Sequence, residues 1–472
     1  MYKKINQKIK NEIERIVGQK NMIVDSEKMS DYSHDEFSLR EIGREPELVV
    51  KPKKVKDVAA ILKLANKEMI PVTPRGGATG LCGGCVPSKG GIVLSLENMN
   101  QVLEIDKDNQ MAVVESGVLL MDFYRTVEEA GLFFPPHPGD ESAMIGGLIA
   151  TNAGGSRAVK YGVIRNYVKG IEMVLASGEI VTFGGKIMKS STGYNLLNLI
   201  IGSEGTLGII TKAIINLLLP PPLIRFLIIP YDDLEKAIET VPLLGLKKIL
   251  PMAVEFIERE VIQVTEEYLK MKWPCKEGKT YLLIILDASS SEEIDRMSES
   301  IAEVCLDQGA FDVFVADTQK KQEDILKIRS MIYEAIKDYT IEILDIVVPR
   351  AEIPGHVKKV HEVSRKYGIW LPTFGHAADG NVHTHIMKAR FKDGNIIPIK
   401  EEKWRKIFEN VRQELYQDCK RRGGVISGEH GIGLVKKHFL SYVLDKKQIE
   451  LMKGIKKLFD PKNILNPNKI FD

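Results

Sequence analysis

Three glycine-rich stretches in the first 210 residues constrain the fold of this chain more than any other feature. The first covers residues 75–84, the second 146–155 and the third 202–208. Glycine has no side chain and adopts positive φ angles freely, so the backbone N–H groups of such stretches can turn inward and cradle phosphate oxygens. For the second stretch, a tightly packed turn of small residues without a ligand is the alternative. None of the three follows a strand with the spacing GxGxxG, and GxxxxGK[ST] is absent, so neither a Rossmann site nor a P-loop is supported.

Short strands and amphipathic helices alternate around these stretches. Apolar residues at helical spacing predict helices over 4–18 and 56–67, while apolar runs predict strands over 47–52, 91–96 and 111–115. Two further strands, 171–176 and 180–183, flank Ser177-Gly178, which is typical of a hairpin turn.

Pro220, Pro221 and Pro222 mark a domain boundary, because proline continues neither a helix nor a central strand. Beyond them glycines become sparse, and strands alternate with helices, which predicts an α+β domain with helices on one face of its sheet. We therefore expect three parts: residues 1–220, 221–425 and 426–472. In the second and third parts, the expected strands are 223–230, 281–287, 311–315 and 345–350, and the expected helices are 232–244, 258–271, 291–308, 320–336, 354–367, 404–422 and 447–459.

A histidine cluster lies in the stretch 374–386, which holds His376, His383 and His385. The sequence Asp379-Gly380-Asn381 is turn chemistry, so a strand is expected to continue from residue 382 to 387. Side chains two residues apart on a strand point to the same face, which places His383 and His385 together.

A second glycine-rich turn, 427–433, carries a carboxylate beside an imidazole, Glu429 and His430. Two histidines and one carboxylate can form an open site for Zn, Mn or Fe(II), which leaves positions for a substrate. Scattered surface histidines, or histidines with structural partners, are the alternative.

Composition excludes several classes of protein. The chain has 472 residues and a net charge of +2, which gives no global attraction to nucleic acid or to an anionic membrane. Its five cysteines form no regular framework and indicate a reducing compartment. No apolar run reaches the roughly 18 residues of an integral membrane segment, and the basic N-terminus lacks the apolar core of a signal peptide. A cytoplasmic protein is therefore expected.

Together, these blocks resemble the FAD-linked oxidases of the vanillyl-alcohol oxidase type, and within them the group of the glycolate oxidases and the D-lactate and D-2-hydroxyglutarate dehydrogenases. The matching blocks are 74–84, 146–155, 202–209, 375–383, 427–431 and 460–467, and they span nearly the whole chain in the expected order. The resemblance implies an α+β fold: an FAD-binding domain of two subdomains, a cap domain with a ferredoxin-like sheet, and a C-terminal helical segment that returns to the flavin.

The resemblance also implies that the glycine loops hold FAD. Attachment is expected to be noncovalent, because Ala78 and Thr79 stand where covalent members carry a histidine. Cys82 and Cys85 form a CxxC inside this loop rather than at the start of a helix, so a redox disulfide is the less favoured interpretation. The expected cofactor-binding residues are Pro74, Arg75, Gly76, Gly77, Ala78, Thr79, Gly80, Gly83, Pro138, Gly139, Asp140, Gly146, Gly147, Thr151, Asn152, Gly155, Ser156, Gly162, Gly205, Ile209 and Asn466.

By the same resemblance, His376, His383 and Glu429 are expected to ligate a divalent metal (Zn, Fe or Mn), and His430 to act as the catalytic base. Arg329 and Arg350 are candidates for gripping a substrate carboxylate, because the planar guanidinium matches that group; surface salt bridges are the alternative. His385 is a candidate substrate contact. It stands where relatives of the D-2-hydroxyglutarate type carry Asn, which puts that substrate in question.

The implied reaction is the oxidation of a D-2-hydroxy acid, with D-lactate favoured, to a 2-keto acid by metal-assisted hydride transfer to the flavin. D-2-hydroxyglutarate or glycolate oxidation with a quinone or iron–sulfur acceptor is the alternative. The resemblance implies a quinone, an iron–sulfur subunit or an electron-transfer flavoprotein as the electron acceptor. The sequence shows neither a membrane segment nor a cysteine spacing for an iron–sulfur cluster, which favours a separate protein. Of the acceptors that the resemblance implies, an electron-transfer flavoprotein is the expected one. Two other functions compete with this one: oxidation of an unrelated alcohol on the same fold, and a metal-dependent hydrolase or binding protein whose glycines only form turns.

Overall fold

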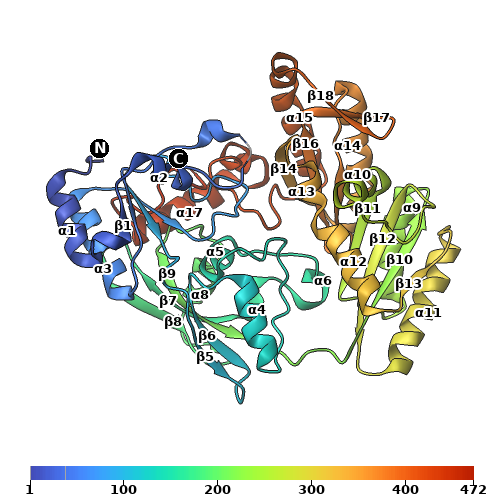
Figure 1. The fold of residues 1–472 in the computed structure, drawn as a ribbon, viewed down its shortest axis with the longest axis horizontal. Helices are drawn as coiled ribbons and strands as arrows, with labels where there is room; N and C mark the ends of the chain where they lie inside the picture. The colour runs from blue at the N-terminus through green and yellow to red at the C-terminus, as the bar shows by residue number, and fades with distance from the viewer. Residues whose placement is uncertain (1, 38, 472) are drawn as a thin grey trace. The chain divides into compact units, whose positions relative to one another are not determined.

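The computed structural model of the protein describes residues 2–37 and 39–471, and its elements are drawn in Figure 1. The chain divides into two compact units. The first unit contains the described residues of 1–153, 163–220 and 429–472, and the second contains residues 154–162 and 221–428. One of the points at which the chain passes from the first to the second unit, between Pro220 and Pro221, lies within the run of three prolines.

The first unit begins with a four-stranded sheet in the order β1-β2-β4-β3. Strands β2 and β3 lie parallel to β4, and β1 is antiparallel to β2. The strands are β1 (Met22–Ile23), β2 (Leu48–Val50), β3 (Val72–Arg75) and β4 (Ile92–Ser95).

Helices α1 (Gln7–Val17) and α3 (Val55–Glu68) contribute the apolar faces predicted from their spacing. Ile9 and Ile13 of α1 join Ile61 and Leu62 of α3 in one buried core with strands β2 to β4. These two helix predictions are confirmed to within a few residues at each end.

The second sheet of this unit has five antiparallel strands in the order β5-β6-β9-β7-β8. The predicted hairpin is confirmed: β7 pairs with β8, and Gly178 in the turn has a φ of +86°, which favours glycine. The strands are β5 (Val102–Asp106), β6 (Met111–Glu115), β7 (Val168–Val174), β8 (Ile180–Gly184) and β9 (Ile209–Asn216). The helices beside them are α4 (Leu120–Glu129), α5 (Ile145–Thr151), α7 (Ile164–Tyr167) and α8 (Leu196–Ile200).

The C-terminal segment is built into the first unit. After α16 (Leu440–Val443) and α17 (Lys446–Phe459), residue Leu465 forms a parallel bridge to Val72 of β3. The buried ammonium of Lys456 donates to Asp460 and to the carbonyl oxygens of Thr206 and Leu465. A buried Lys–Asp pair with further hydrogen bonds holds this segment in place.

The second unit is organised around a seven-stranded sheet in the order β13-β10-β12-β11-β15-β16-β14, in which every pairing is antiparallel. The strands are β10 (Leu223–Tyr231), β11 (Ala253–Glu258), β12 (Thr280–Ala288), β13 (Phe314–Ala316), β14 (Thr340–Val347), β15 (Thr373–His376) and β16 (Asn381–Met387). The expected α+β class is confirmed.

Helices cover both faces of this sheet, so the prediction of helices on one face was wrong. One face packs in a buried cluster with α10 (Arg259–Leu269), α12 (Gln319–Ser330) and α13 (Ile332–Ile336). The helices α9 (Leu234–Leu246), α11 (Ser291–Asp307), α14 (Ile353–Tyr367) and α15 (Glu401–Arg421) lie outside that cluster, and α9, α11 and α15 contact the sheet directly. The reason is visible in β12, which is buried at every position and therefore apolar on both sides.

Two boundaries also differ from the predictions. The strand expected at 345–350 begins at Thr340 and ends before Pro349, while Arg350 lies in the 3₁₀ turn η4 (Arg350–Glu352). The helix expected at 320–336 is two helices, α12 and α13, which meet at Met331.

The remaining elements are short. They are α2 (Ser26–Met29), α6 (Ala158–Tyr161), β17 (Ala389–Lys392), β18 (Asn395–Pro398), η1 (Gln19–Asn21), η2 (Ser30–Tyr32), η3 (Arg40–Ile42) and η5 (Lys437–Phe439). Within the described residues, no helix combines the length and the apolar character that a bilayer crossing requires.

Candidate active site

The histidine-bearing strands form a hairpin in the second unit. Strand β15 turns into β16 through Gly380, whose φ is +96° and whose added Cβ would lie 2.2 Å from the carbonyl oxygen of Val348. In the register of the sheet, His383 pairs with Asp345 of β14, and His385 pairs with Ile343. His383 and His385 therefore share a face of the sheet, as predicted.

His376 shares this face as well. Its ring centroid lies 5.3 Å from that of His383, and the two rings are perpendicular. Both side chains are buried. The structure thus brings together, within one unit, two histidines that sequence analysis assigned to a metal site.

Glu255 of β11 is the partner of His376 across the sheet. Its side chain is only 2% exposed, and its Oε1 pairs with Nδ1 of His376. Arg329 of α12 donates from Nε and from Nη2 to the other oxygen, Oε2, at 2.9 and 2.5 Å. Burial opposes ionisation of Glu255, but His376 and Arg329 outweigh it and lower the pKa of this carboxyl to about 2.

Asp345 of β14 fastens the chain that leads to Glu429 and His430. Its buried carboxylate accepts hydrogen bonds from Asn381 Nδ2 at 2.9 Å, from the Ser427 hydroxyl at 2.8 Å and from the Gly428 N–H at 2.9 Å. A bridge between Asp345 and Ser427 extends this contact along the backbone. Glu429 and His430 follow Gly428 directly in the chain.

Each unit contributes one pair of side chains with metal-donor atoms. In the second unit, His383 Nδ1 lies 3.8 Å from Asp345 Oδ1. In the first unit, His430 Nε2 lies 3.8 Å from Glu429 Oε1. His383 and Glu429 belong to the predicted ligand set, Asp345 and His430 were not predicted as ligands, and His376 is in neither pair. Imidazole nitrogens with carboxylate oxygens suit Zn, Fe or Mn, so the donor chemistry fits a transition metal.

The other predicted catalytic residues differ in their surroundings. His385 is buried and stacks on Phe374 at a centroid distance of 5.0 Å. The guanidinium of Arg329 lies 5.0 Å from the same ring, in addition to its ion pair with Glu255. Arg350 lies in η4 with an exposed side chain, unlike the buried His376, His383 and Glu255.

Glu255 and Asp345 were both missed as site residues by sequence analysis. Each is a carboxylate inside an otherwise apolar strand sequence, Ala253-Val-Glu-Phe-Ile257 and Ile343-Leu-Asp-Ile-Val347. A charged side chain in a strand that is buried throughout needs a specific partner, and that signal could have identified them.

In the first unit, the loop after β3 has the backbone of an anion site. The N–H groups from Gly77 to Gly80 donate to no other group in the part of the chain that the structure describes. Ala78 has a φ of +61°, an uncommon conformation for a residue with a side chain and one that occurs in anion-binding nests. Gly139 and Gly147 have no atom within 4 Å of an added Cβ, so space is open beside both. These features fit a ligand that carries phosphate groups.

Several predicted loop residues instead have structural contacts. An added Cβ on Gly146 would lie 2.6 Å from the Ser116 Cβ, and one on Gly205 would lie 2.5 Å from Pro74 Cγ. The Arg75 guanidinium donates to the carbonyl oxygens of Asp31 and His34 at 2.8 and 2.6 Å, so its side chain fastens that segment.

Four other predicted loop residues make hydrogen bonds within the unit. Asp140 accepts from the N–H and hydroxyl of Ser142, and Thr151 donates to the carbonyl of Gly147. Asn152 ends α5 in a left-handed conformation, while Asn466 Nδ2 donates to the carbonyl oxygens of Gly84 and Glu204. The remaining predicted residues of this unit, which lie in the same loops or at the start of β9, are Gly76, Thr79, Gly83, Pro138 and Ile209. Gly155, Ser156 and Gly162 belong to the second unit.

Glu204 was not among the predicted residues, yet it holds the turn that follows His430. Its buried carboxylate accepts hydrogen bonds from the N–H groups of Ile432 and Gly433 at 2.7 and 2.8 Å. Burial raises the pKa of Glu204, and the two N–H donors act in the opposite direction. Its position between glycines in the block 202–208 was the available signal.

Cys82 and Cys85 are free thiols in this loop. Burial raises the pKa of Cys85 to about 11, which disfavours the thiolate that redox exchange requires. Cys82 donates from Sγ to the carbonyl of Gly431 at 3.2 Å.

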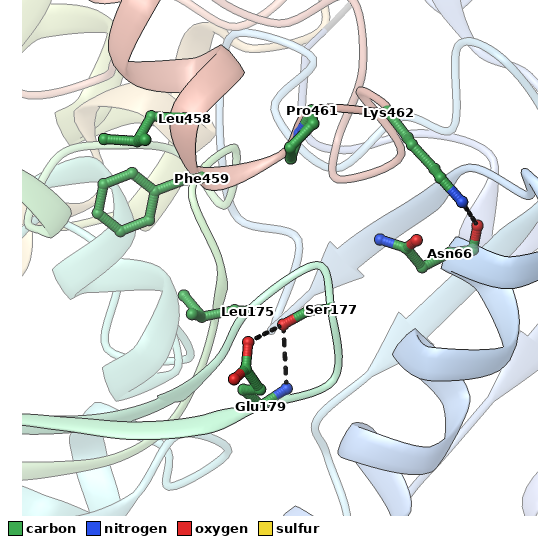
Figure 2. Close-up of a pocket in the computed structure, with 8 residues that line it drawn as sticks. All are labelled: Asn66, Leu175, Ser177, Glu179, Leu458, Phe459, Pro461 and Lys462. Carbon is green, nitrogen blue, oxygen red and sulfur yellow. Dashed lines mark hydrogen bonds between the residues drawn. The ribbon is translucent and has the colours of Figure 1, made fainter.

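A cavity of about 470 Å³ lies elsewhere in the first unit (Figure 2). Figure 2 shows its polar groups bonded to one another: Lys462 donates to the carbonyl of Asn66, and Ser177 donates to Glu179. None of the predicted site residues lines it. We assign it no role in catalysis.

Comparison with known proteins identifies both halves of the chain. Residues 46–184 match a family described as an FAD binding domain, and residues 220–470 match the C-terminal domain of FAD linked oxidases. A D-lactate dehydrogenase from Archaeoglobus fulgidus is 46% identical over 90% of this chain and 91% of that protein. A D-lactate dehydrogenase from Anaerostipes hadrus is 41% identical, with coverage of 96% and 95%. The glycolate oxidase subunit GlcD of Bacillus subtilis is 38% identical, with coverage of 99% and 97%.

Among solved structures, p-cresol methylhydroxylase superposes with a TM-score of 0.76 at 17% identity, covering 100% of this chain and 99% of that one. At this identity the likeness shows the fold alone. It supports the vanillyl-alcohol oxidase type of fold expected from sequence.

Proposed function

Because this chain belongs to the FAD-linked oxidase family, we propose that it is an FAD-dependent D-lactate dehydrogenase. The substrate assignment follows the two D-lactate dehydrogenases that match it over nearly their whole length. The observation that supports a hydroxy-acid chemistry is the presence of two pairs of metal-donor side chains. Asp345 and His383 form the buried pair, and Glu429 and His430 form the half-buried pair, which includes the candidate base.

The first unit supplies the residues proposed to hold the cofactor. The N–H groups of Gly77 to Gly80 would bind the pyrophosphate, and the open space beside Gly139 and Gly147 would receive the rest of the ligand. When bound, FAD supplies the group that accepts the hydride from the substrate. The loop carries no histidine at Ala78 or Thr79, which favours noncovalent binding.

His376, His383 and Glu429 are proposed to hold a divalent metal (Zn, Fe or Mn). When bound, the metal would lower the pKa of the substrate hydroxyl. Asp345 accepts three hydrogen bonds already, so its proposed part is to anchor the segment that carries Glu429.

His430 is proposed to take the hydroxyl proton as general base. Its Nε2 lies 3.8 Å from Glu429 Oε1, which keeps the base next to a proposed metal ligand. Arg350, which is exposed, and Arg329, which retains Nη1 beyond its bonds to Glu255, are proposed to bind the substrate carboxylate. His385 is proposed to line the substrate site.

Glycolate is the second candidate substrate, because a glycolate oxidase subunit is 38% identical to this chain. D-2-hydroxyglutarate is a weaker candidate because of His385. For the electron acceptor, we propose an electron-transfer flavoprotein. Anaerobic mixing with D-lactate should reduce such a partner only when this protein is present; no reduction would remove the partner from the proposal.

The role of His430 can be tested by His430→Gln. We expect the variant to bind FAD normally, while flavin reduction by D-lactate slows by about 10²–10⁴-fold, the usual contribution of a general base. His438→Gln, an exposed histidine in η5, is the matched control and should reduce its flavin at the wild-type rate. A near-native rate for His430→Gln would remove the base from the proposal.

A further inference from the structure

We propose that Glu255 is a positioning residue for the metal site: its carboxylate fixes the His376 ring so that Nε2 is the nitrogen offered to the metal. This inference rests on the proposed function, because it presumes that His376 is a metal ligand. It adds a residue from β11, far from the other members of the site in sequence.

The sheet register places the two side chains together. Glu255 and His376 are directly opposed residues of antiparallel strands β11 and β15, so their side chains leave the sheet on the same face. Glu255 Oε1 pairs with His376 Nδ1. A carboxylate accepts hydrogen bonds only, so Nδ1 must carry the proton, and the lone pair of the neutral ring then resides on Nε2. Metal-bound histidines are commonly oriented in this way by a carboxylate on the other ring nitrogen.

Arg329 holds the carboxylate in turn. Two of its three guanidinium nitrogens, Nε and Nη2, donate to Oε2, while Oε1 is left to His376. Rotation of the carboxylate would break both sets of bonds at once. Arg329 also supplies the positive charge that a carboxylate with only 2% exposure requires.

The orientation of His376 matters because of its neighbour. The His376 ring lies perpendicular to the His383 ring at 5.3 Å, and His383 is itself a proposed metal ligand. Oε1 of Glu255 bonds to His376, and Oε2 bonds to Arg329. Its effect on a metal would therefore act through His376.

A buried carboxylate can also serve stability alone, and the same sheet offers a matched control for that role. Glu342 of β14 is likewise 2% exposed and forms an ion pair with an arginine, Arg412 Nε, at 2.9 Å. It also accepts a hydrogen bond from the Tyr416 hydroxyl of α15 at 3.3 Å. In the sheet register Glu342 pairs with Ile386, so its side chain leaves the sheet on the face opposite to His383 and His385. Glu342→Gln therefore reproduces the loss of a buried, arginine-paired carboxylate away from the histidines.

The experiment compares Mn²⁺ affinity in FAD-loaded, chelator-stripped wild type, Glu255→Gln and Glu342→Gln. Each protein is first shown to melt cooperatively and to carry FAD, and Mn²⁺ is then titrated in the absence of substrate. We expect Glu255→Gln to bind Mn²⁺ about 10–100-fold more weakly, as is usual when the partner of a ligating histidine is lost. Glu342→Gln should bind it within about threefold of wild type, although its melting temperature also falls.

A second variant covers the case in which Glu255→Gln does not fold. Glu255→Asp keeps the charge that faces Arg329 but shortens the side chain by one methylene, which withdraws the carboxylate from His376. It too should bind Mn²⁺ more weakly than Glu342→Gln does.

The outcomes separate this inference from the proposed function. If Glu255→Gln, or Glu255→Asp in its place, binds Mn²⁺ no more weakly than Glu342→Gln, the positioning role is overturned and the metal site stands. If the wild type itself binds no Mn²⁺ or Zn²⁺, the metal site is overturned, and the role of Glu255 with it.

Discussion

Two adjacent glycines, Gly146 and Gly147 in α5, should respond to alanine in opposite ways. A Cβ on Gly146 would lie 2.6 Å from the Ser116 Cβ, about 1 Å inside an ordinary carbon–carbon contact. Overpacking of this kind costs about 1–3 kcal/mol. A Cβ on Gly147 would meet no atom within 4 Å. Both variants gain the same helix-propensity benefit of about 0.5–1 kcal/mol, so their difference isolates the packing cost.

The assay has two parts. In urea denaturation of FAD-free protein, Gly146→Ala should unfold about 1–3 kcal/mol more easily than Gly147→Ala, which should be at least as stable as wild type. In FAD titration, Gly147→Ala should instead be the more affected variant. If the flavin occupies the open space beside Gly147, the added Cβ should weaken FAD binding by about 5–150-fold, which corresponds to the same packing cost of about 1–3 kcal/mol. Equal stability of the two variants would refute the packing argument. Wild-type FAD affinity of Gly147→Ala would show that the cofactor does not lie against this glycine.

Three further predictions concern single groups. Burial raises the pKa of Asp35 to about 6, so the folded protein binds the carboxyl proton more tightly than the unfolded chain does. Protonation of Asp35 therefore stabilises the fold. This contribution is complete below the ordinary pKa of 3.8 and is lost as the pH rises through about 6. Wild type should therefore gain melting temperature relative to Asp35→Asn between pH 7 and 5, and a constant difference would contradict this. Glu204→Gln removes the charged acceptor of the Ile432 and Gly433 N–H groups and should lower the free energy of unfolding, measured with urea, by about 1–3 kcal/mol. An unchanged free energy of unfolding would show that these bonds do not stabilise the turn. Chelation should abolish bleaching of the flavin by substrate while FAD stays bound, and Mn²⁺ should restore it; bleaching that survives complete metal removal would exclude a metal from the reaction.

Local patterns in the sequence predicted the local geometry of the site. The alternation of side chains along a strand placed His383 and His385 on one face, and the glycine at position 380 marked the turn before them. Turn chemistry likewise located the hairpin around Gly178. These features depend only on neighbours in the chain.

Contacts between segments that are distant in the sequence could not be predicted from such local patterns. Glu255 is 121 residues from His376, and nothing in either segment states that β11 and β15 are paired. Asp345 lies in a predicted strand, but its bonds to Ser427 and Gly428 depend on how a segment some 80 residues later is laid beside β14. Sheet order is decided by packing of the whole unit, which one sequence does not reveal.

Errors in the fold also have physical reasons. The apolar run of β12 is compatible with a strand that has one covered face, but burial on both sides explains its unbroken apolar residues Leu282–Leu286 better. The predicted start of β14 is too late because Glu342 interrupts the apolar residues of its first half, between Ile341 and Ile343; that carboxylate is buried by its pairing with Arg412. A buried ion pair thus concealed the strand from hydrophobicity alone.

The most direct test of the central claim is an anaerobic visible spectrum of the FAD-loaded protein before and after addition of D-lactate. The proposed function predicts the absorption bands of oxidised flavin, which bleach on addition of D-lactate and persist with L-lactate. Bands that bleach only with glycolate or another 2-hydroxy acid would change the substrate and keep the chemistry. Folded protein that takes up no FAD, or flavin that no 2-hydroxy acid reduces, would contradict the account.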